Sequence, residues 1–347
     1  MKKLLSILLL AFTAFMALAQ QNCDMIYIYR NDGERNSFFR DEVKAFSYSR
    51  VDADGHEFED IVSQFVETRD STYYIPLSDI DSISFSKQRF SSEILFRLSS
   101  FGVSPFSSSA QGMDIYQDEV MFQAGLGGNI IYVLDLNSQT CLGTIIFEAP
   151  NGEPSHMNNI NCGDKYLSTD RWPLLYLSQT TNSHACFVLR LSNNASSYEI
   201  VQTIKYGGEK HHINSLYDWF IDTKNGYIYT YGYYNGIINK REILKFPLPP
   251  HNVGDVIFTD DDVIDSFVLS DMSIYQGTKI INGFLYAPVG YGNNDYPGYL
   301  KIVDLKEKKL KMSIAITCGE PESIGKYKNG MIICGGGKNS NFYYIQM

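Results

Sequence analysis

Polar residues of the same types and spacing recur at separate places in this chain. The pattern His-x-Asn occurs at His156–Asn158 and at His212–Asn214, and Gln-Gly begins at Gln111 and at Gln276. Amide, imidazole and carboxyl groups offer both hydrogen-bond donors and acceptors, so they suit a site for a sugar, a polar small molecule or a cation. We predict seven ligand-binding side chains: Gln111, His156, Asn158, His212, Asn214, Gln276 and Glu322.

A Glu-Pro-Glu run offers acid–base chemistry as an alternative. Glu320 and Glu322 could act as acid and base with help from a histidine, since glycoside hydrolysis uses a pair of carboxyl groups. Such enzymes need the two carboxyl groups on different sides of a pocket, and Asp114 is the candidate partner. Acidic residues at strand starts more often act as caps or face solvent. We therefore favour binding over catalysis by Glu320 and Glu322.

Metal and cofactor sites receive weaker support. His211 and His212 are adjacent, and successive residues of a strand point to opposite faces. The acidic run 260–265 could hold Ca²⁺ through carboxylate oxygens, but it lacks the glycine and glutamate spacing of an EF-hand. A solvated loop is the better interpretation of that run. We expect no cofactor and no dedicated metal site, with Ca²⁺ as the alternative.

Aromatic residues are the other candidates for ligand contact, because their rings stack on sugars as readily as they fill a core. Tyrosine alone occurs 25 times. We predict core packing for an alternating run: Tyr227, Tyr229, Tyr231 and Tyr233. Trp172 and Tyr176 fall where a loop should meet a strand, and we predict an exposed contact there.

The elements that must position these residues are strands. An apolar strand ending in a polar turn recurs from residues 133, 188, 243 and 302. Further strands are predicted before each at 119–123, 174–178, 227–231 and 283–288, and after each at 142–147, 200–204, 253–258 and 310–316. With an innermost strand added, each repeat has four short antiparallel strands, which is the blade of a β-propeller.

The end of the chain supplies an incomplete fifth repeat. Residues 320–347 contain only three strands, and the orphan strand at 93–101 can provide the fourth. Joining the two ends of the ring in this way leaves no open sheet edge. The predicted fold class is therefore all-β: a five-bladed β-propeller with circular closure by an upstream strand, plus a small N-terminal β-rich module.

Two sequence patterns resemble known families. The strand Leu134–Leu136 followed by Thr144–Ile145 resembles propeller repeats of the "Y-V-T-N" type, and the Q-G, H-x-N and E-P-E elements are similar to strand starts in secreted propellers. That resemblance implies a polar pocket at the propeller axis. The "Y-R-N-D-G" turn at Tyr29–Gly33 and the "I-D-S-I-x-F" strand at Ile80–Phe85 resemble N-terminal modules of secreted surface proteins of gut bacteria. This second resemblance implies an exported, modular protein.

The N-terminus has the features of a secretory signal peptide. Lys2 and Lys3 precede an apolar run from Leu4 to Leu18, and Ala17–Ala19 forms an A-x-A cleavage site. A lipoprotein anchored through Cys23 is less well supported, because the preceding residues do not form a lipobox. We expect a signal peptide at 1–19, a β-rich module at 20–90 and the propeller at 91–347. The expected location is periplasmic, extracellular or at the cell surface, with no membrane span in the mature chain.

The composition of the chain limits the classes of partner that it can bind. The formal charge is −10, or −12 without Lys2 and Lys3, and there is no basic cluster, which excludes nucleic acid and anionic membrane as natural partners. Most of the six cysteines are expected to be buried thiols, and Cys162 with Cys186 is the best candidate for a disulfide. We expect a monomer.

The leading function hypothesis is non-catalytic binding of a glycan, another small polar ligand or a surface protein at the channel mouth or on the loops. The alternative is a carbohydrate-active hydrolase or lyase, and a third possibility is a purely structural module. An enzyme requires two acidic groups from different blades facing one pocket, at least one of them with a perturbed pKa. That feature separates the first two hypotheses.

Overall fold

The chain is described here by a computed structural model. It covers residues 25–31, 35–39, 43–52, 56–68, 72–86, 93–126, 129–152, 156–180, 184–211, 213–237, 240–270, 276–293, 298–316, 318–337 and 340–346. The predicted signal peptide at 1–19 and Cys23 lie outside these residues. Within them every regular element is a strand or a short 3-10 helix, so the fold is all-β. None of their helices is long and apolar enough to cross a membrane.

The described residues form two compact units. Among the described residues, the first unit comprises those up to 86 with 311–316, and the second comprises those at 93–293, 298–310 and 318–346. In the first unit, β1 (Met25–Arg30) pairs antiparallel with both β2 (Arg35–Phe39) and β6 (Ile80–Ser86). A second sheet has β3 (Ala45–Ser49), β4 (Ser63–Glu67) and β5 (Thr72–Pro76), and η1 (Leu77–Asp79) connects β5 to β6. The predicted strand at Ile80–Phe85 is confirmed, whereas part of the predicted turn at Tyr29–Gly33 lies outside the described residues.

The second unit contains five sheets, numbered here in chain order. Sheet 1 has β8 (Ala110–Tyr116), β9 (Val120–Gly125), β10 (Ile130–Asp135) and β11 (Thr140–Ile146). Sheet 2 has β12 (Met157–Cys162), β13 (Leu175–Gln179), β14 (Cys186–Leu191) and β15 (Tyr198–Tyr206). Sheet 3 has β16 (Ile213–Asp222), β17 (Tyr227–Tyr234), β18 (Lys240–Pro247) and β20 (Asp265–Ser270).

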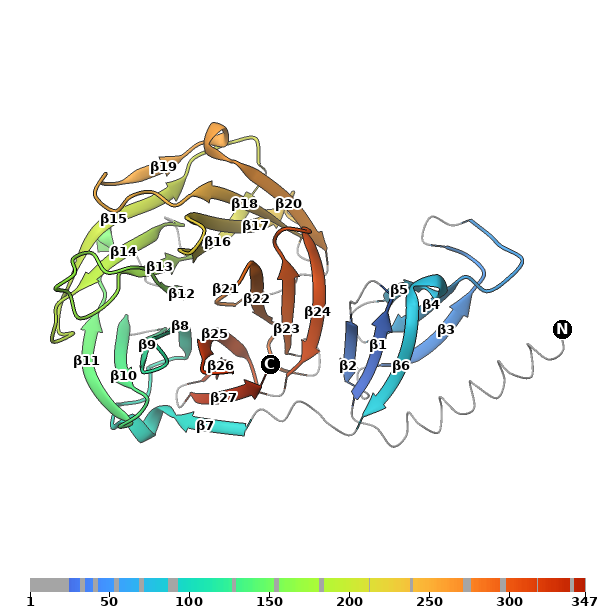
Figure 1. The fold of residues 1–347 in the computed structure, drawn as a ribbon, viewed down its shortest axis with the longest axis horizontal. Helices are drawn as coiled ribbons and strands as arrows, with labels where there is room; N and C mark the ends of the chain where they lie inside the picture. Colours follow the sequence, from blue (N-terminus) through green and yellow to red (C-terminus); the bar gives the residue numbers. More distant parts are fainter. Residues whose placement is uncertain are drawn as a thin grey trace. The chain divides into compact units, whose positions relative to one another are not determined.

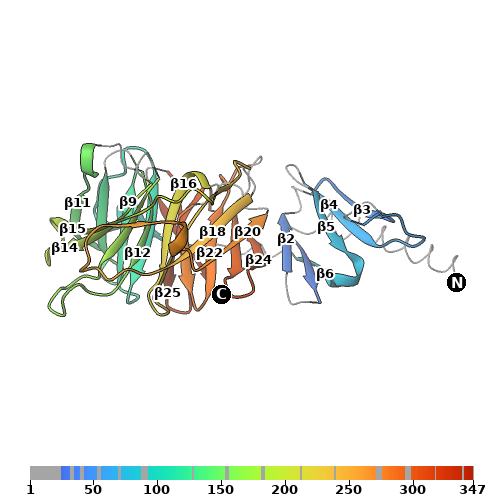
Figure 2. The ribbon, with the colours of Figure 1, turned by 90° about the horizontal axis from the view of Figure 1, so that it is seen from above.

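Two further sheets complete the unit. Sheet 4 has β21 (Lys279–Ile281), β22 (Phe284–Val289) and β23 (Tyr299–Asp304), followed in the chain by β24 (Lys309–Ala315). Sheet 5 has β25 (Pro321–Tyr327), β26 (Gly330–Gly335), β27 (Asn341–Gln346) and β7 (Glu93–Arg97). The five sheets surround a common centre, with β8, β12, β16, β21 and β25 nearest to it (Figure 1). Figure 2 shows the same sheets after a 90° turn from the view of Figure 1.

The core lies between successive sheets. Apolar side chains of sheets 1 and 2 form one cluster around Phe122 and Phe187, and sheets 5 and 1 form another around Phe342 and Met121. Similar clusters join sheets 2 and 3 and sheets 3 and 4. Because strands near the centre of such an arrangement are covered on both faces, their sequences are almost continuously buried.

The strand upstream of sheet 1 pairs with the last strand of the chain. β7 runs antiparallel to β27, with Phe96 opposite Phe342, and η2 (Leu98–Phe101) follows it. The predicted use of 93–101 to complete the last repeat is confirmed.

One strand assignment was wrong. Residues 253–258 were predicted as the fourth strand of the third repeat, but β19 (Val256–Phe258) pairs parallel with β15 of sheet 2. β20 takes the fourth place in sheet 3 instead. The physical reason is the burial of Phe258, whose ring stacks on Phe246 at 4.4 Å between sheets 2 and 3.

The candidate pair Cys162 and Cys186 forms no disulfide, and both are free thiols. β13 separates them: Cys162 lies opposite Leu175 at one end of β13, and Cys186 lies opposite Ser178 towards the other end. Strands on either side of a shared neighbour are roughly 9–10 Å apart, which exceeds the reach of a disulfide.

Trp172 and Tyr176 are core residues and form no exposed contact. Their exposed fractions are 4 % and 3 %. The Trp172 indole N–H donates to the Ser192 carbonyl, and its ring meets Phe122 edge-on. A polar tip with an internal partner allows an aromatic side chain of this size to be buried.

Candidate functional site

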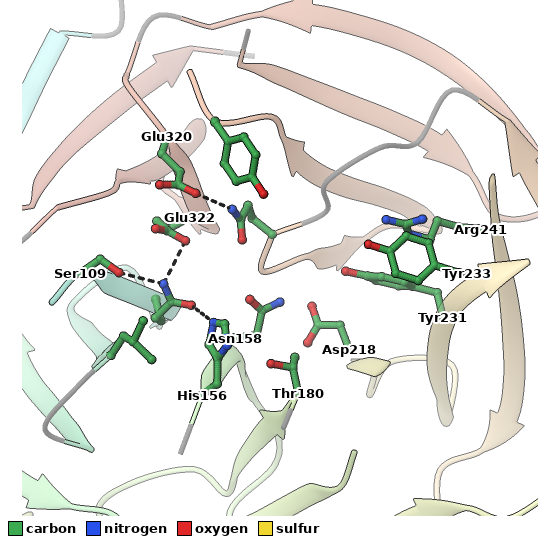
Figure 3. A pocket seen from close by; sticks show the side chains of 14 residues that line it. Ser109, His156, Asn158, Thr180, Asp218, Tyr231, Tyr233, Arg241, Glu320 and Glu322 are labelled. Carbon is green, nitrogen blue, oxygen red and sulfur yellow. Dashed lines mark hydrogen bonds between the residues drawn. The ribbon is translucent and has the colours of Figure 1, made fainter. Parts of the chain in front are cut away.

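Side chains from the innermost strands of several sheets line one pocket with a volume of about 360 Å³ (Figure 3). Five of the seven predicted binding residues contribute to it: Gln111, His156, Asn158, Gln276 and Glu322. Glu320 lines it as well. His212 lies outside the described residues. Asn214 lies in β16 opposite Tyr233, but its side chain is not described.

The repeated Gln-Gly pair has a geometric explanation. The glutamine lines the pocket, and the following glycine lets the neighbouring innermost strand come close. A Cβ atom on Gly112 would lie 2.6 Å from the backbone of Asn159, and one on Gly277 would lie 2.8 Å from the Asn158 carbonyl oxygen. Both distances are too short for any side chain, so glycine is required there.

Gln111 is the centre of a hydrogen-bond network. Its Nε2 donates to the Ala110 carbonyl at 2.9 Å, to Ser109 Oγ at 3.1 Å and to Glu322 Oε2 at 3.2 Å. The carbonyl can only accept, which places the amide oxygen towards His156, 2.8 Å from its Nε2. His156 therefore donates from Nε2. Burial lowers the pKa of His156, which keeps the ring neutral near pH 7.

The carboxyl groups of Glu320 and Glu322 are partly shielded from solvent, that of Glu322 more than that of Glu320. Burial, together with the nearby Glu320 carboxylate, raises the pKa of Glu322 to about 9, and the hydrogen bond from Gln111 only partly opposes this. Burial also raises the pKa of Glu320, whose Oε1 accepts a hydrogen bond from Gln276 at 3.1 Å. Glu322 is thus a protonated acid at neutral pH, because desolvation penalises the charged form.

Asp218 on β16 is a pocket residue that the sequence analysis missed. It is 1 % exposed, and burial raises its pKa to about 7, against hydrogen bonding that favours the ionised form. Oδ1 accepts the Trp219 N–H at 3.1 Å, whereas Oδ2 has no hydrogen-bond partner of good geometry among the described residues. A bulge between Asn214 and Asp218 shifts the register of β16. The only sequence signal was an acid inside an apolar, aromatic strand.

Tyrosines of β17 meet the pocket from sheet 3. Tyr229 and Tyr231 pack in the core as predicted, and Tyr227 packs against it. Tyr231 also lines the pocket, as does Tyr233, which is not part of that core. The guanidinium of Arg241 lies 3.7 Å from the centre of the Tyr233 ring. Arg241 is 2 % exposed and had no sequence signal beyond its charge within a strand. The remaining lining residues, also missed, are Ser109, Leu126, Thr180 and Tyr291.

Asp114, the proposed second carboxylate of a catalytic pair, does not line the pocket. It is fully buried, pairs with the Lys279 ammonium and accepts the Cys162 N–H at 2.6 Å. These contacts join β8 to β12 and to β21. A buried carboxylate with a cationic partner and a backbone donor holds strands together, and this prediction was wrong.

The acidic residues that follow β19 accept hydrogen bonds from nearby groups. Asp260 accepts hydrogen bonds from the Tyr206 hydroxyl and from backbone N–H groups, and Asp262 caps the short helix η4 (Asp260–Asp262) through Thr259. His211 Nδ1 lies 2.7 Å from Glu242 Oε1. Among the described residues no group of three or more potential metal ligands is assembled.

Comparisons with known proteins give only distant similarities. No family model matches the sequence, and no curated protein matches it. A luciferin-regenerating enzyme is 8% identical, with a TM-score of 0.42, over 72% of this chain and 94% of that one. Glutaminyl cyclase of Myxococcus xanthus is 11% identical, with a TM-score of 0.41, over 70% and 93%. Similarities of this size carry no information about what this chain does.

Proposed function

We propose that residues 92–347 form a five-bladed β-propeller, exported from the cell and closed by β7. Five sheets around one centre, apolar clusters between successive sheets and the β7–β27 pairing support this architecture. A propeller places its innermost strand starts around the axis, where a ligand site can form.

We propose further that the pocket binds a polar, hydroxyl-rich ligand of the glycan class without changing it chemically. The observation that carries this proposal is the convergence of polar side chains from separate sheets on one pocket. Its volume of about 360 Å³ falls within the range of about 300–1,000 Å³ that is usual for small-ligand sites. Amides, hydroxyls and a neutral imidazole offer donors and acceptors to hydroxyl groups, and tyrosine rings offer faces on which a sugar can stack.

The test is binding to a glycan array with two pocket variants, Gln111→Ala and His156→Ala. We expect each to weaken the wild-type hits about tenfold or more, because each removes part of one connected hydrogen-bond network. His56→Ala is the matched control, since that histidine is exposed and lies in the first unit. If both pocket variants retain full binding to every hit, the pocket is not the site.

A second candidate function is cleavage of a carbohydrate by a hydrolase or lyase reaction, and the pocket has the feature that such an enzyme requires. Asp218 on sheet 3 and Glu322 on sheet 5 line the same pocket, so acidic groups from two different sheets face it. The raised pKa of Glu322, about 9, suits a general acid, and Asp218 with a pKa of about 7 is a candidate base.

Release of reducing ends from the oligosaccharides that bind separates the two functions. A hydrolase would release them, and Glu322→Gln would lower that rate by about a hundredfold or more while leaving binding measurable. A binding protein would release none above the protein-free control, whatever residue occupies position 322.

A further inference from the structure

Three carboxyl groups line the pocket, and their chemistry indicates the kind of ligand that it prefers. We propose that it selects ligands carrying a protonated amino group, held between Asp218 on β16 and the carboxyl groups of Glu322 on β25 and Glu320 just before it. The inference rests on the proposed binding function and names the charge and chemistry of the ligand. For a glycan, the matching class is an amino sugar with a free amine.

The first observation is the unused oxygen of Asp218. The side chain is almost fully buried and lines the pocket. Asn158 and Tyr231 lie close enough to hydrogen-bond its carboxyl group, but Oδ2 has no partner of standard geometry among the described residues. A buried acceptor without a partner costs free energy, which a ligand donor at that position would recover. Because the acceptor belongs to a carboxyl group, a cationic donor gives the stronger hydrogen bond.

The second observation is a pair of carboxyl groups on another sheet facing the same pocket. Glu320 and Glu322 come from the start of β25, and the two hydrogen bonds described for them each use one carboxyl oxygen. Figure 3 shows both near one another, across the pocket from Asp218. An ammonium group donates in three directions, so it can serve carboxyl groups that approach from two sides.

Arg241, the cationic residue that lines the pocket, lies on one side of it. Arg241 stacks on Tyr233, and Figure 3 shows this pair on the side opposite Glu320 and Glu322. In the free protein near pH 7, Glu322 keeps its proton, so the charged lining groups are Glu320, Asp218 in part, and Arg241. An ammonium group entering between the acids favours their ionisation, and with all three ionised it faces three negative charges and one positive charge.

Three matched tetrasaccharides test this inference by isothermal titration calorimetry at pH 7. The β-1,4-linked chitosan, chitin and cellulose tetramers differ at carbon 2, which carries an ammonium, an acetamide or a hydroxyl group. We expect the chitosan tetramer to bind at least about tenfold more tightly than the other two. Asp218→Asn, which keeps the shape of the side chain, should remove most of that preference. If Asp218→Asn fails to fold, the half-buried Glu320→Gln serves in its place.

The outcomes separate this inference from the function on which it rests. If the chitin or cellulose tetramer binds as tightly as chitosan and Gln111→Ala weakens it, the amine preference is wrong and glycan binding stands. If putrescine binds with the same sensitivity to Asp218→Asn and no tetramer does, the amine preference stands and the glycan proposal falls. If no tetramer and no diamine shows binding that depends on Gln111 or Asp218, both are wrong.

Discussion

Glu322 combines near-complete burial with a position at the ligand pocket. It is 3 % exposed, and burial next to Glu320 holds its pKa near 9, compared with 4.5 for an exposed glutamate. In the folded protein it therefore keeps a proton over a pH range in which the unfolded chain has released it. Asp218 behaves in the same way over a lower range, up to about pH 7.

This difference predicts how stability depends on pH. Between about pH 4.5 and 9 the folded state binds more protons at Glu322 than the unfolded state, so the free energy of unfolding falls as pH rises. Glu322→Gln cannot titrate, and we expect its stability to fall less than that of the wild type between pH 5 and 8. Urea denaturation at pH 5, 6, 7 and 8 measures this.

Glu307→Gln makes the same substitution at an exposed turn residue and should follow the wild-type curve. A Glu322→Gln curve parallel to that of the wild type would show that the glutamate is ionised in the folded protein.

Much of the pocket was visible in the sequence because repeated motifs mark equivalent strand starts. Gln111, His156 and Gln276 belong to such motifs. Asp218 and Arg241 do not repeat, and they reach the pocket through a bulge in β16 and through stacking on Tyr233. Contacts of that kind depend on tertiary register, which a pattern along one strand does not contain.

At the scale of elements, β7 is the strand whose pairing with β27 completes sheet 5. Its side chains alternate: Phe96 is 8 % exposed and packs with Phe101 and Tyr327, whereas Leu95 is 40 % exposed. The buried face of β7 should therefore carry most of its contribution to stability.

We expect Phe96→Ala to lower the free energy of unfolding by about 3 kcal/mol or more through lost burial and a cavity. Leu95→Ala, on the other face of the same strand, should cost less than about 1 kcal/mol. Denaturant titration of both variants compares the two faces directly. Equal losses would mean that β7 adds little to the packing of sheet 5.

The repeat period was sufficient to find most strands, including the closing strand, because each repeat returns to the same turn and apolar pattern. The repeat period predicts the wrong sheet for the strand at 253–258, because a short apolar segment can join either of two neighbouring sheets. Phe258 decided the outcome by packing against Phe246, which is 12 residues away in the chain and in another sheet. A contact between two side chains of this kind cannot be predicted from the repeat period of the sequence.

At the scale of the whole molecule, the described cysteines are all free thiols, although the sequence predicts an exported protein. Burial raises the pKa of the thiols of Cys186 and Cys334, which keeps them protonated and unreactive. Stability then rests on the cores between sheets and on strand pairing, with no covalent link among these residues.

Because the five described cysteines form no disulfide, we expect a reducing agent to leave the melting temperature unchanged to within about 1 °C. Thermal melts with and without dithiothreitol measure this. Alkylation of the intact protein, followed by mass spectrometry, should label Cys186 and Cys334 only after denaturation. A clear fall in melting temperature on reduction would contradict the free thiols.

The close approach at Gly112 and Gly277 also affects how a ligand can move. Just past the pocket, the innermost strands touch through their backbones, and the Asn159 amide bridges to the carbonyls of Trp219 and Thr278. These contacts narrow the passage beyond the pocket. If the pocket binds a glycan as proposed, a long polymer would insert a terminus or a side branch, and the number of free ends would limit how many copies of the protein one polymer holds.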